Sequence, residues 1–160
     1  MALQFDPPDL LTEKAASGPP VTQFSVFIHN KVGRLLEVIK ILAQANIHAV
    51  ALTILDTSDA AIVRLIVDDP ENARVLFNER GLAFTENRVL VVELTSSGED
   101  LQPLLMALLQ SECNLHSCIP LLIRPHGKAA FAIHVEDPDI AASVLVSYDF
   151  TLLTQGDISR

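Results

Sequence analysis

The stretch "VDDP" at residues 67–70 returns as "VEDP" at residues 135–138, an offset of 68 residues. The stretch "NIH" at residues 46–48 returns as "NLH" at residues 114–116 with the same offset. "GLAFT" (81–85) likewise aligns with "DFTLL" (149–153). Separate anchors that share one spacing indicate that the chain contains an internal repeat.

Each half of the repeat is predicted to contain strand, helix, strand, strand, helix and strand. Apolar residues at every second position of 24–29 predict the first strand, and an apolar stripe through Leu35–Ala45 predicts a helix that Asn46 ends. Asp69 and Pro70 suit the N-cap and first position of the second helix. The predicted elements are 24–29, 35–45, 47–55, 60–67, 70–81 and 82–85, followed by 89–94, 101–111, 115–123, 128–135, 139–147 and 150–154.

This order predicts an α+β fold of two ferredoxin-like βαββαβ repeats, with the helices on one face of an antiparallel sheet. A unit of about 60–70 residues buries only roughly 60% of its unfolded surface, so the two copies are expected to pack as one body. Side-by-side pairing of their edge strands would give a continuous eight-stranded sheet and would remove two exposed edges.

The repeat also sets the expected domain boundaries. Residues 1–21 contain four prolines and no periodic pattern, and they are predicted to form a flexible tail. The first repeat is predicted to span residues 22–87, and the second residues 88–160. Phe27, Ile62 and Ile66 point to the sheet face opposite the helices, and this apolar face predicts a homodimer.

Composition and charge exclude several classes of function. The chain has 160 residues, 49% of them hydrophobic, and a net charge of −9. A negative charge of this size argues against a nucleic-acid partner, since phosphate binding needs a basic surface. No apolar run approaches the roughly 20 residues of a membrane helix, and the acidic, proline-containing start does not resemble a secretory signal. We therefore expect a cytoplasmic protein with no membrane partner.

The turn between the first strand and the first helix is the candidate binding segment. It reads His29-Asn30-Lys31-Val32-Gly33-Arg34 and leads into a helix N-terminus, where free backbone N–H groups favour an anion such as a carboxylate. Gly33 would let the backbone approach a ligand, and Asn30 offers both donors and acceptors. The alternative interpretation is that Asn30 and Gly33 simply form a tight turn.

The repeat and the stretch "FIHNKVGRL" together resemble ACT domains, small regulatory modules that bind amino acids. Asn30, Lys31, Gly33 and Leu35 match the family's loop, whereas Val32 stands where the family usually has proline. Asn46-Ile47 and Asn114-Leu115 match the asparagine that often begins the family's second strand. The resemblance covers about residues 22–156 and is that of a tandem ACT protein.

In the ACT family, the loop of one module and the second strand of its neighbour contribute to the ligand site. The resemblance therefore implies a site for a small amino acid that is formed by Asn30, Lys31, Val32, Gly33, Arg34, Leu35, Asn114, His116 and Ser117. The corresponding second site would join Asn46 and His48 to the loop "TSSGEDL", which includes Gly98 and Glu99. That loop lacks the asparagine and adds acidic residues, so the second site is predicted to be degenerate.

No pattern in the sequence indicates catalysis, a metal or a cofactor. The five histidines have no close ligand spacing, and the acidic pairs resemble helix starts. Cys113 and Cys118 are expected to be buried, reduced thiols on opposite faces of one strand. We predict a non-catalytic regulatory protein that signals to an enzyme of amino-acid metabolism. The alternatives are a ligand-free dimerisation and protein-interaction module, and an enzyme on a dimeric α+β scaffold.

Overall fold

The computed structural model describes residues 18–29, 33–95 and 99–159. The first part of the chain forms two helices and most of a sheet: β1 (Val21–His29), α1 (Arg34–Gln44), β2 (Ala49–Asp56), β3 (Ala60–Val67), α2 (Pro70–Glu79) and β4 (Ala83–Glu93). The second part repeats the pattern: α3 (Leu101–Gln110), β5 (Leu115–Pro120), the short 3-10 helix η1 (Pro125–Gly127), β6 (Ala130–Val135), α4 (Pro138–Ser147), β7 (Thr151–Leu153) and α5 (Gln155–Ile158). In the described residues, no helix is long and apolar enough to cross a membrane.

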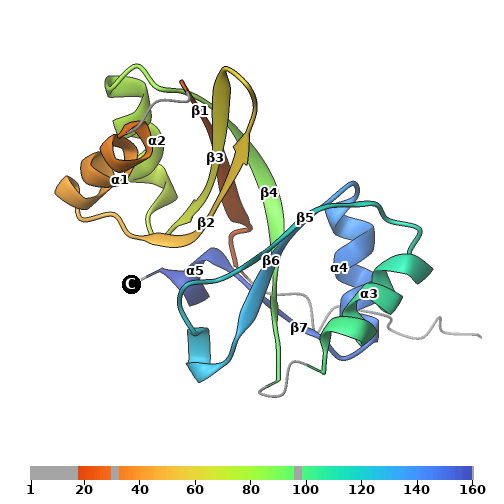
Figure 1. The fold of residues 1–160 in the computed structure, drawn as a ribbon. Coiled ribbons are helices and arrows are strands. Elements are labelled where there is room, and N and C mark those ends of the chain that lie inside the picture. Colours follow the sequence, from red (N-terminus) through yellow and green to blue (C-terminus); the bar gives the residue numbers. More distant parts are fainter. Residues whose placement is uncertain (1–17, 30–32, 96–98, 160) are drawn as a thin grey trace, which may run out of the picture.

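The sheet has seven antiparallel strands in the order β2-β3-β1-β4-β6-β5, and β7 also pairs with β4. The prediction of eight strands is wrong because the expected strands 82–85 and 89–94 are one strand. Residues 83–89 of β4 pair with β1, and residues 90–93 pair with β6. The predicted boundary between residues 87 and 88 therefore lies inside a strand that belongs to both repeats (Figure 1).

All four long helices pack against the same face of the sheet. Phe84 of β4 packs into the core under α1 and α2, while Leu90 and Val92 belong to the core under α3 and α4. These residues are all even-numbered, and alternate side chains of a strand share one face. Figure 1 shows the two helix pairs on the outside, with β4 running between the repeats.

The opposite face of the sheet closes on itself and forms a third core. Val50, Ile66, Val91 and Ile119 meet in this cluster, so both repeats contribute to it. The two edges of the sheet, at β2 and β5, also meet. The N–H of Leu122, just after β5, donates to the carbonyl oxygen of Val50 in β2 at 2.7 Å. The apolar face that predicted a second chain is thus covered in part within the chain: Ile66 is buried, whereas Phe27 is 43% exposed.

Helix ends follow the same rules in both repeats. Asp69 and Asp137 accept hydrogen bonds from backbone N–H groups of α2 and α4, which confirms the caps expected from the Asp-Pro pairs. Asn46 follows Ala45, the C-cap of α1, and has a positive φ of 57°; the N–H of Ile47 donates back to the carbonyl of Leu42 at 2.9 Å. Such a left-handed residue ends a helix by satisfying its last carbonyl groups.

The alignment of Asn46 with Asn114 is wrong by two residues. The residue that follows α3 with positive φ is Glu112. The carbonyl of His48 accepts from the N–H of Asp68, and the carbonyl of Asn114 accepts from that of Glu136, so Asn114 is the counterpart of His48. The offset between equivalent residues of the two repeats is therefore 66 before the β5–β6 connection and 68 after it. The stretch from Asn114 to Glu136, which includes that connection, contains two more residues than its counterpart from His48 to Asp68. His48 and His116 are not counterparts.

The two ends of the described chain lie against each other. β1 begins at Val21, one residue inside the predicted tail, and Val21 is buried; residues 1–17 lie outside the described chain. The carbonyl of Pro19 accepts from the N–H of Gln155 at 3.0 Å. Gln155 begins α5, a helix that the sequence did not predict and that a capping box between Thr154 and Asp157 stabilises.

Both cysteines are free thiols in different surroundings. Cys113 is half-buried, and its Sγ lies 3.5 Å from the carbonyl oxygen of Asp137. Cys118 in β5 is an exposed residue, which corrects the prediction that both thiols are buried. Burial of part of the side chain still raises the pKa of the Cys118 thiol.

Candidate functional site

The turn that the sequence singled out leads into α1 through Gly33. Asn30, Lys31 and Val32 lie outside the described residues. Gly33 is the N-cap of α1 with φ 92°, a conformation that favours glycine, and its carbonyl accepts from the N–H of Glu37 at 2.9 Å. In the described chain no atom lies within 4 Å of the place where a Cβ on Gly33 would stand. Glycine is required here by the backbone, and the space beside it is open.

Arg34 and Leu35 begin α1 and point to different surroundings. Leu35 packs against the core of the first repeat. The guanidinium of Arg34 lies on the surface and donates to the Glu37 carboxylate at 2.7 Å, with both side chains about half exposed or more. A surface ion pair of this kind contributes little to stability, so Arg34 can change partner at low cost.

Next to this turn is an open cavity of about 780 Å³, which we call the turn cavity. Three cationic residues line it together with one carboxylate, Glu37; the cations are Arg34, Lys40 and Arg80. The remaining lining residues include Phe27, Ile28, Val38, Ile41, Leu82 and Ala83. In a chain of net charge −9, a cavity that gathers three cations beside apolar residues suits an anion with an apolar portion.

The other predicted ligand residues lie elsewhere, at the start of β5. Asn114 donates its side-chain amide to Glu136 at 2.8 Å, and the rings of His116 and His134 lie 5.1 Å apart. The Oγ of Ser117 is buried and has no partner in the described chain. In Figure 1, β5 comes from α3 on one side of β4, whereas α1 lies with the first repeat on the other. Asn114, His116 and Ser117 are not among the described residues that line the turn cavity.

The residues of the predicted second site are also separated. Asn46 and His48 line a cavity of about 390 Å³ with Asp68 and Asp69. His48 is held there by Asp68, whose two carboxylate oxygens lie 2.8 Å from the backbone N and 2.9 Å from Nδ1. Its acidic lining does not suit a carboxylate ligand.

Glu99 lies on a different surface, beside the exposed face of α3 with Leu101, Leu105, Met106 and Leu109. Gly98 lies outside the described residues. In the described part of the chain, no cluster of three or more histidine, cysteine, aspartate or glutamate side chains could hold a metal.

Comparison with known proteins assigns the family. A family model described as "ACT domain pair" matches residues 20–158. The chain belongs to this family. The match covers both repeats, so the internal repeat that the sequence predicted is a pair of ACT domains, and ACT domain pairs are regulatory modules. No curated protein matches the chain.

Several solved structures are similar to this chain over most of its length. Protein BT0572 from Bacteroides thetaiotaomicron is 27% identical, with a TM-score of 0.80 over 88% of this chain and 96% of that chain. The ligand-free regulatory subunit of aspartate kinase from Thermus thermophilus is 12% identical, with a TM-score of 0.57 over 80% and 91% of the two chains. The regulatory subunit from Thermus flavus is 15% identical, with a TM-score of 0.54 over 84% and 99%. At these low identities, the two kinase subunits show the shared fold alone.

Sequence reasoning found Arg34 but missed the two other cations of the turn cavity. Lys40 lies two turns further along α1, and Arg80 follows α2 next to Gly81, whose φ is 64°. Nothing in the local sequence links Arg80 to α1, because only the packing of the two helices places Arg80 at this cavity. A search for cations on the exposed face of α1 would have found Lys40.

Proposed function

We propose that this ACT domain pair is a non-catalytic regulatory protein that binds a small amino acid at the turn cavity and signals to a metabolic enzyme. The observation that carries the proposal is the gathering of Arg34, Lys40 and Arg80 around an open cavity next to the N-terminus of α1. The cations and the helix N-terminus attract the carboxylate, and Glu37 offers a partner for the ammonium group.

The interior of the turn cavity supports a ligand with a small apolar side chain. Phe27 is 43% exposed and offers an aromatic surface to a ligand in the turn cavity. Val38 and Ile41 on α1 and Leu82 on the other side provide further apolar surface. A cavity with apolar walls and a few charged groups is typical of small-molecule sites.

We further propose that the complete site forms in a homodimer. Asn114, His116 and Ser117 lie away from the turn cavity within one chain, so they would reach a ligand there only from a second copy. The exposed side chain of Phe27, on the sheet face that predicted a homodimer, supports this arrangement.

Calorimetric titration of the full-length protein with each of the twenty amino acids tests the proposal. We expect at least one of them to bind, and the double variant R34Q/K40Q to weaken that binding by about a hundredfold or more, since each of the two charged hydrogen bonds contributes about 1.5–3 kcal/mol. Arg124→Gln removes an exposed arginine outside the turn cavity and serves as the matched control. If no amino acid binds, or if R34Q/K40Q binds as well as the wild type, the turn cavity is not the site.

The exposed face of α3 favours a second candidate function, a protein-interaction module. Leu105, Met106 and Leu109 are 45%, 47% and 72% exposed on this one helix. Contiguous apolar surface of this kind marks interaction sites in soluble proteins. Sedimentation equilibrium tests whether the occupant is a second copy: L105E/L109E should then be monomeric at concentrations where the wild type is a dimer.

A further inference from the structure

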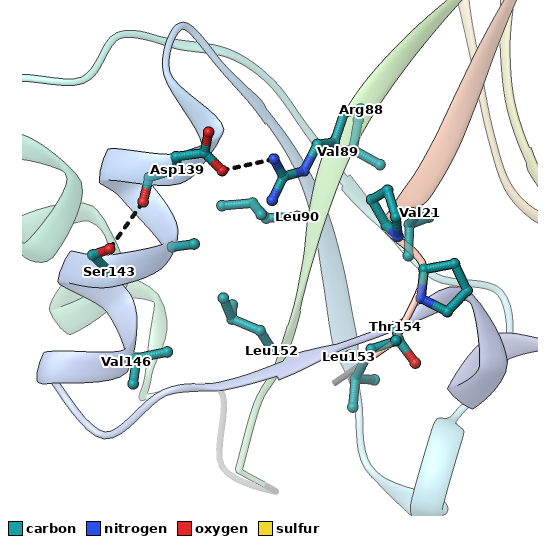
Figure 2. Close-up of a pocket in the computed structure, with 14 residues that line it drawn as sticks. Val21, Arg88, Val89, Leu90, Asp139, Ser143, Val146, Leu152, Leu153 and Thr154 are labelled. Atoms are coloured by element: carbon teal, nitrogen blue, oxygen red, sulfur yellow. Dashed lines mark hydrogen bonds and ion pairs between the residues drawn. The ribbon is translucent and has the colours of Figure 1, made fainter. Parts of the chain in front are cut away.

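A second cavity lies where the start of the described chain meets the second repeat. It has a volume of about 450 Å³ and is enclosed by residues 18–21, Arg88–Leu90 of β4, the exposed side of α4 and Leu152–Thr154. We call it the α4 groove, and Figure 2 shows its lining. Its lining shares no residue with the turn cavity or with the ligand residues expected from the ACT resemblance.

Two opposite charges stand at one end of the α4 groove. Nη1 of Arg88 donates to Oδ1 of Asp139 at 2.7 Å, and the two side chains are 43% and 83% exposed. They are the only charged residues among the described residues that line the groove. A guanidinium has five N–H donors and a carboxylate has two acceptor oxygens, so both groups retain unused capacity. A zwitterion can therefore bind by exchanging partners, its carboxylate on Arg88 and its ammonium on Asp139.

Most of the remaining lining is aliphatic, and the hydroxyl groups of Ser143 and Thr154 are its other polar side-chain groups. In Figure 2, the side chains of Leu90, Val146 and Leu152 extend from β4, α4 and β7 into the space between them. Val21 and Val89 complete the apolar surface near the first strand. Branched aliphatic walls favour a ligand that carries an aliphatic side chain, because its burial removes apolar surface from water.

The wall formed by residues 18–20 is fixed by close packing. A Cβ on Gly18 would lie 2.9 Å from Cγ2 of Thr154, so only glycine allows this approach. The carbonyl of Pro19 accepts from the N–H of Gln155 at 3.0 Å, and Pro20 has a fixed φ and restricts the conformation of Pro19 before it. A preformed wall lowers the entropy cost of binding.

We propose that the α4 groove binds a free α-amino acid with an aliphatic side chain. Arg88 holds the carboxylate, Asp139 holds the ammonium group, and Leu90, Val146 and Leu152 contact the side chain. The volume of about 450 Å³ lies within the range of about 300–1,000 Å³ that is typical of small-molecule sites. This site is additional to the turn cavity and does not depend on a ligand there.

Titration of the full-length protein with L-leucine tests this proposal, with 4-methylpentanoate and 3-methylbutylamine as compounds that each lack one charge. We expect leucine to bind more tightly than either, and R88Q and D139N each to weaken leucine binding by about tenfold or more. Arg74→Gln, which removes an arginine from the exposed ion pair with Glu86 in the first repeat, should leave binding unchanged. Val146→Trp should block the groove, whereas Val75→Trp on the exposed side of α2 should not.

Three results would overturn the proposal: no binding of leucine, unchanged binding in R88Q and D139N, or binding of 4-methylpentanoate as tight as that of leucine. The ion pair is on the surface, so R88Q and D139N are expected to fold, and thermal melting checks this. R34Q/K40Q separates the two cavities. Leucine binding that R34Q/K40Q abolishes and R88Q leaves intact belongs to the turn cavity and refutes a site in the α4 groove.

Discussion

The side chain of Gln155 donates through Nε2 to the carbonyl oxygen of Val67 at 3.0 Å, across 88 residues of chain. Gln155 begins α5 at the end of the second repeat, and Val67 ends β3 in the first. A second bond runs beside it, from Oγ of Ser159 to the carbonyl oxygen of Asp68 at 2.6 Å. The last helix therefore fastens the second repeat to the first.

We expect Gln155→Ala to destabilise the protein by about 1–2 kcal/mol, because it leaves the Val67 carbonyl without its donor. Urea unfolding followed by circular dichroism measures this change. Gln102→Ala on the exposed side of α3 is the control and should have almost no effect. An unchanged unfolding midpoint in Gln155→Ala would show that α5 does not stabilise the contact between the repeats.

Gly33→Ala should destabilise the protein by about 1–2 kcal/mol, since alanine is strained at the φ of 92° found there. Gly156→Ala provides a matched comparison. Its Cβ would make an ordinary contact at 3.6 Å with Oγ1 of Thr154, so the change should be neutral or stabilising by about 0.4–1 kcal/mol. Equal effects of the two substitutions on the melting temperature would contradict this account of Gly33.

Phe77→Ala should cost about 3–5 kcal/mol, the usual cost of emptying a buried aromatic site. Phe77 is fully buried, and its ring centroid lies 5.4 Å from that of Phe24 and 5.6 Å from that of Phe84. Phe27→Ala should cost far less, because the Phe27 side chain is 43% exposed. Chemical denaturation of the two variants compares them, and similar losses would show that the aromatic cluster does not stabilise the first repeat.

His134 should make stability depend on pH. Burial lowers the pKa of His134 below its usual range, and the nearby His116 and Arg64 lower it further. The unfolded chain then binds a proton at His134 more readily than the folded protein does. Stability is therefore retained above the usual histidine pKa of about 6.5 and lost as the pH falls below it.

The variant His134→Gln tests this assignment because it removes the titrating group. We expect it to lose less stability than the wild type between about pH 7 and pH 5, as measured by thermal melting. His29→Gln changes an exposed histidine and should follow the wild type. Identical pH profiles for His134→Gln and the wild type would exclude His134 as the cause.

Local sequence patterns predicted most helices and strands of this ACT domain pair but not the joint between its repeats. The Asp-Pro pairs at 69–70 and 137–138 predicted both second helices because capping and proline geometry are local effects. The joint at Glu86-Asn87-Arg88 fell between the predicted strands 82–85 and 89–94, since three polar residues interrupt the apolar pattern. In the structure these residues pair with Thr22–Phe24 of β1, and this distant pairing keeps β4 continuous through the joint.

The candidate sites were predicted only in part, for a similar reason. Arg34 was found because it follows the turn directly, whereas Arg80 reaches the turn cavity from another helix. Arg88 and Asp139 are 51 residues apart, and no spacing rule joins them. The recurrence of "NIH" as "NLH" gave a wrong alignment of β2 with β5. These three residues are similar by chance at an offset of 68, whereas the structural offset at this point is 66, because the two extra residues come later, between β5 and β6.

The sharing of β4 means that neither ACT module can be released by cutting the chain. A break after residue 87 would leave the first fragment without the valines 89 and 91 of the central core, and the second without Val21, which pairs with Val89. Fragments of this kind would have to reassemble by complementation, as the pieces of a split protein do. The duplicated modules thus form one inseparable domain rather than two independent domains joined by a linker.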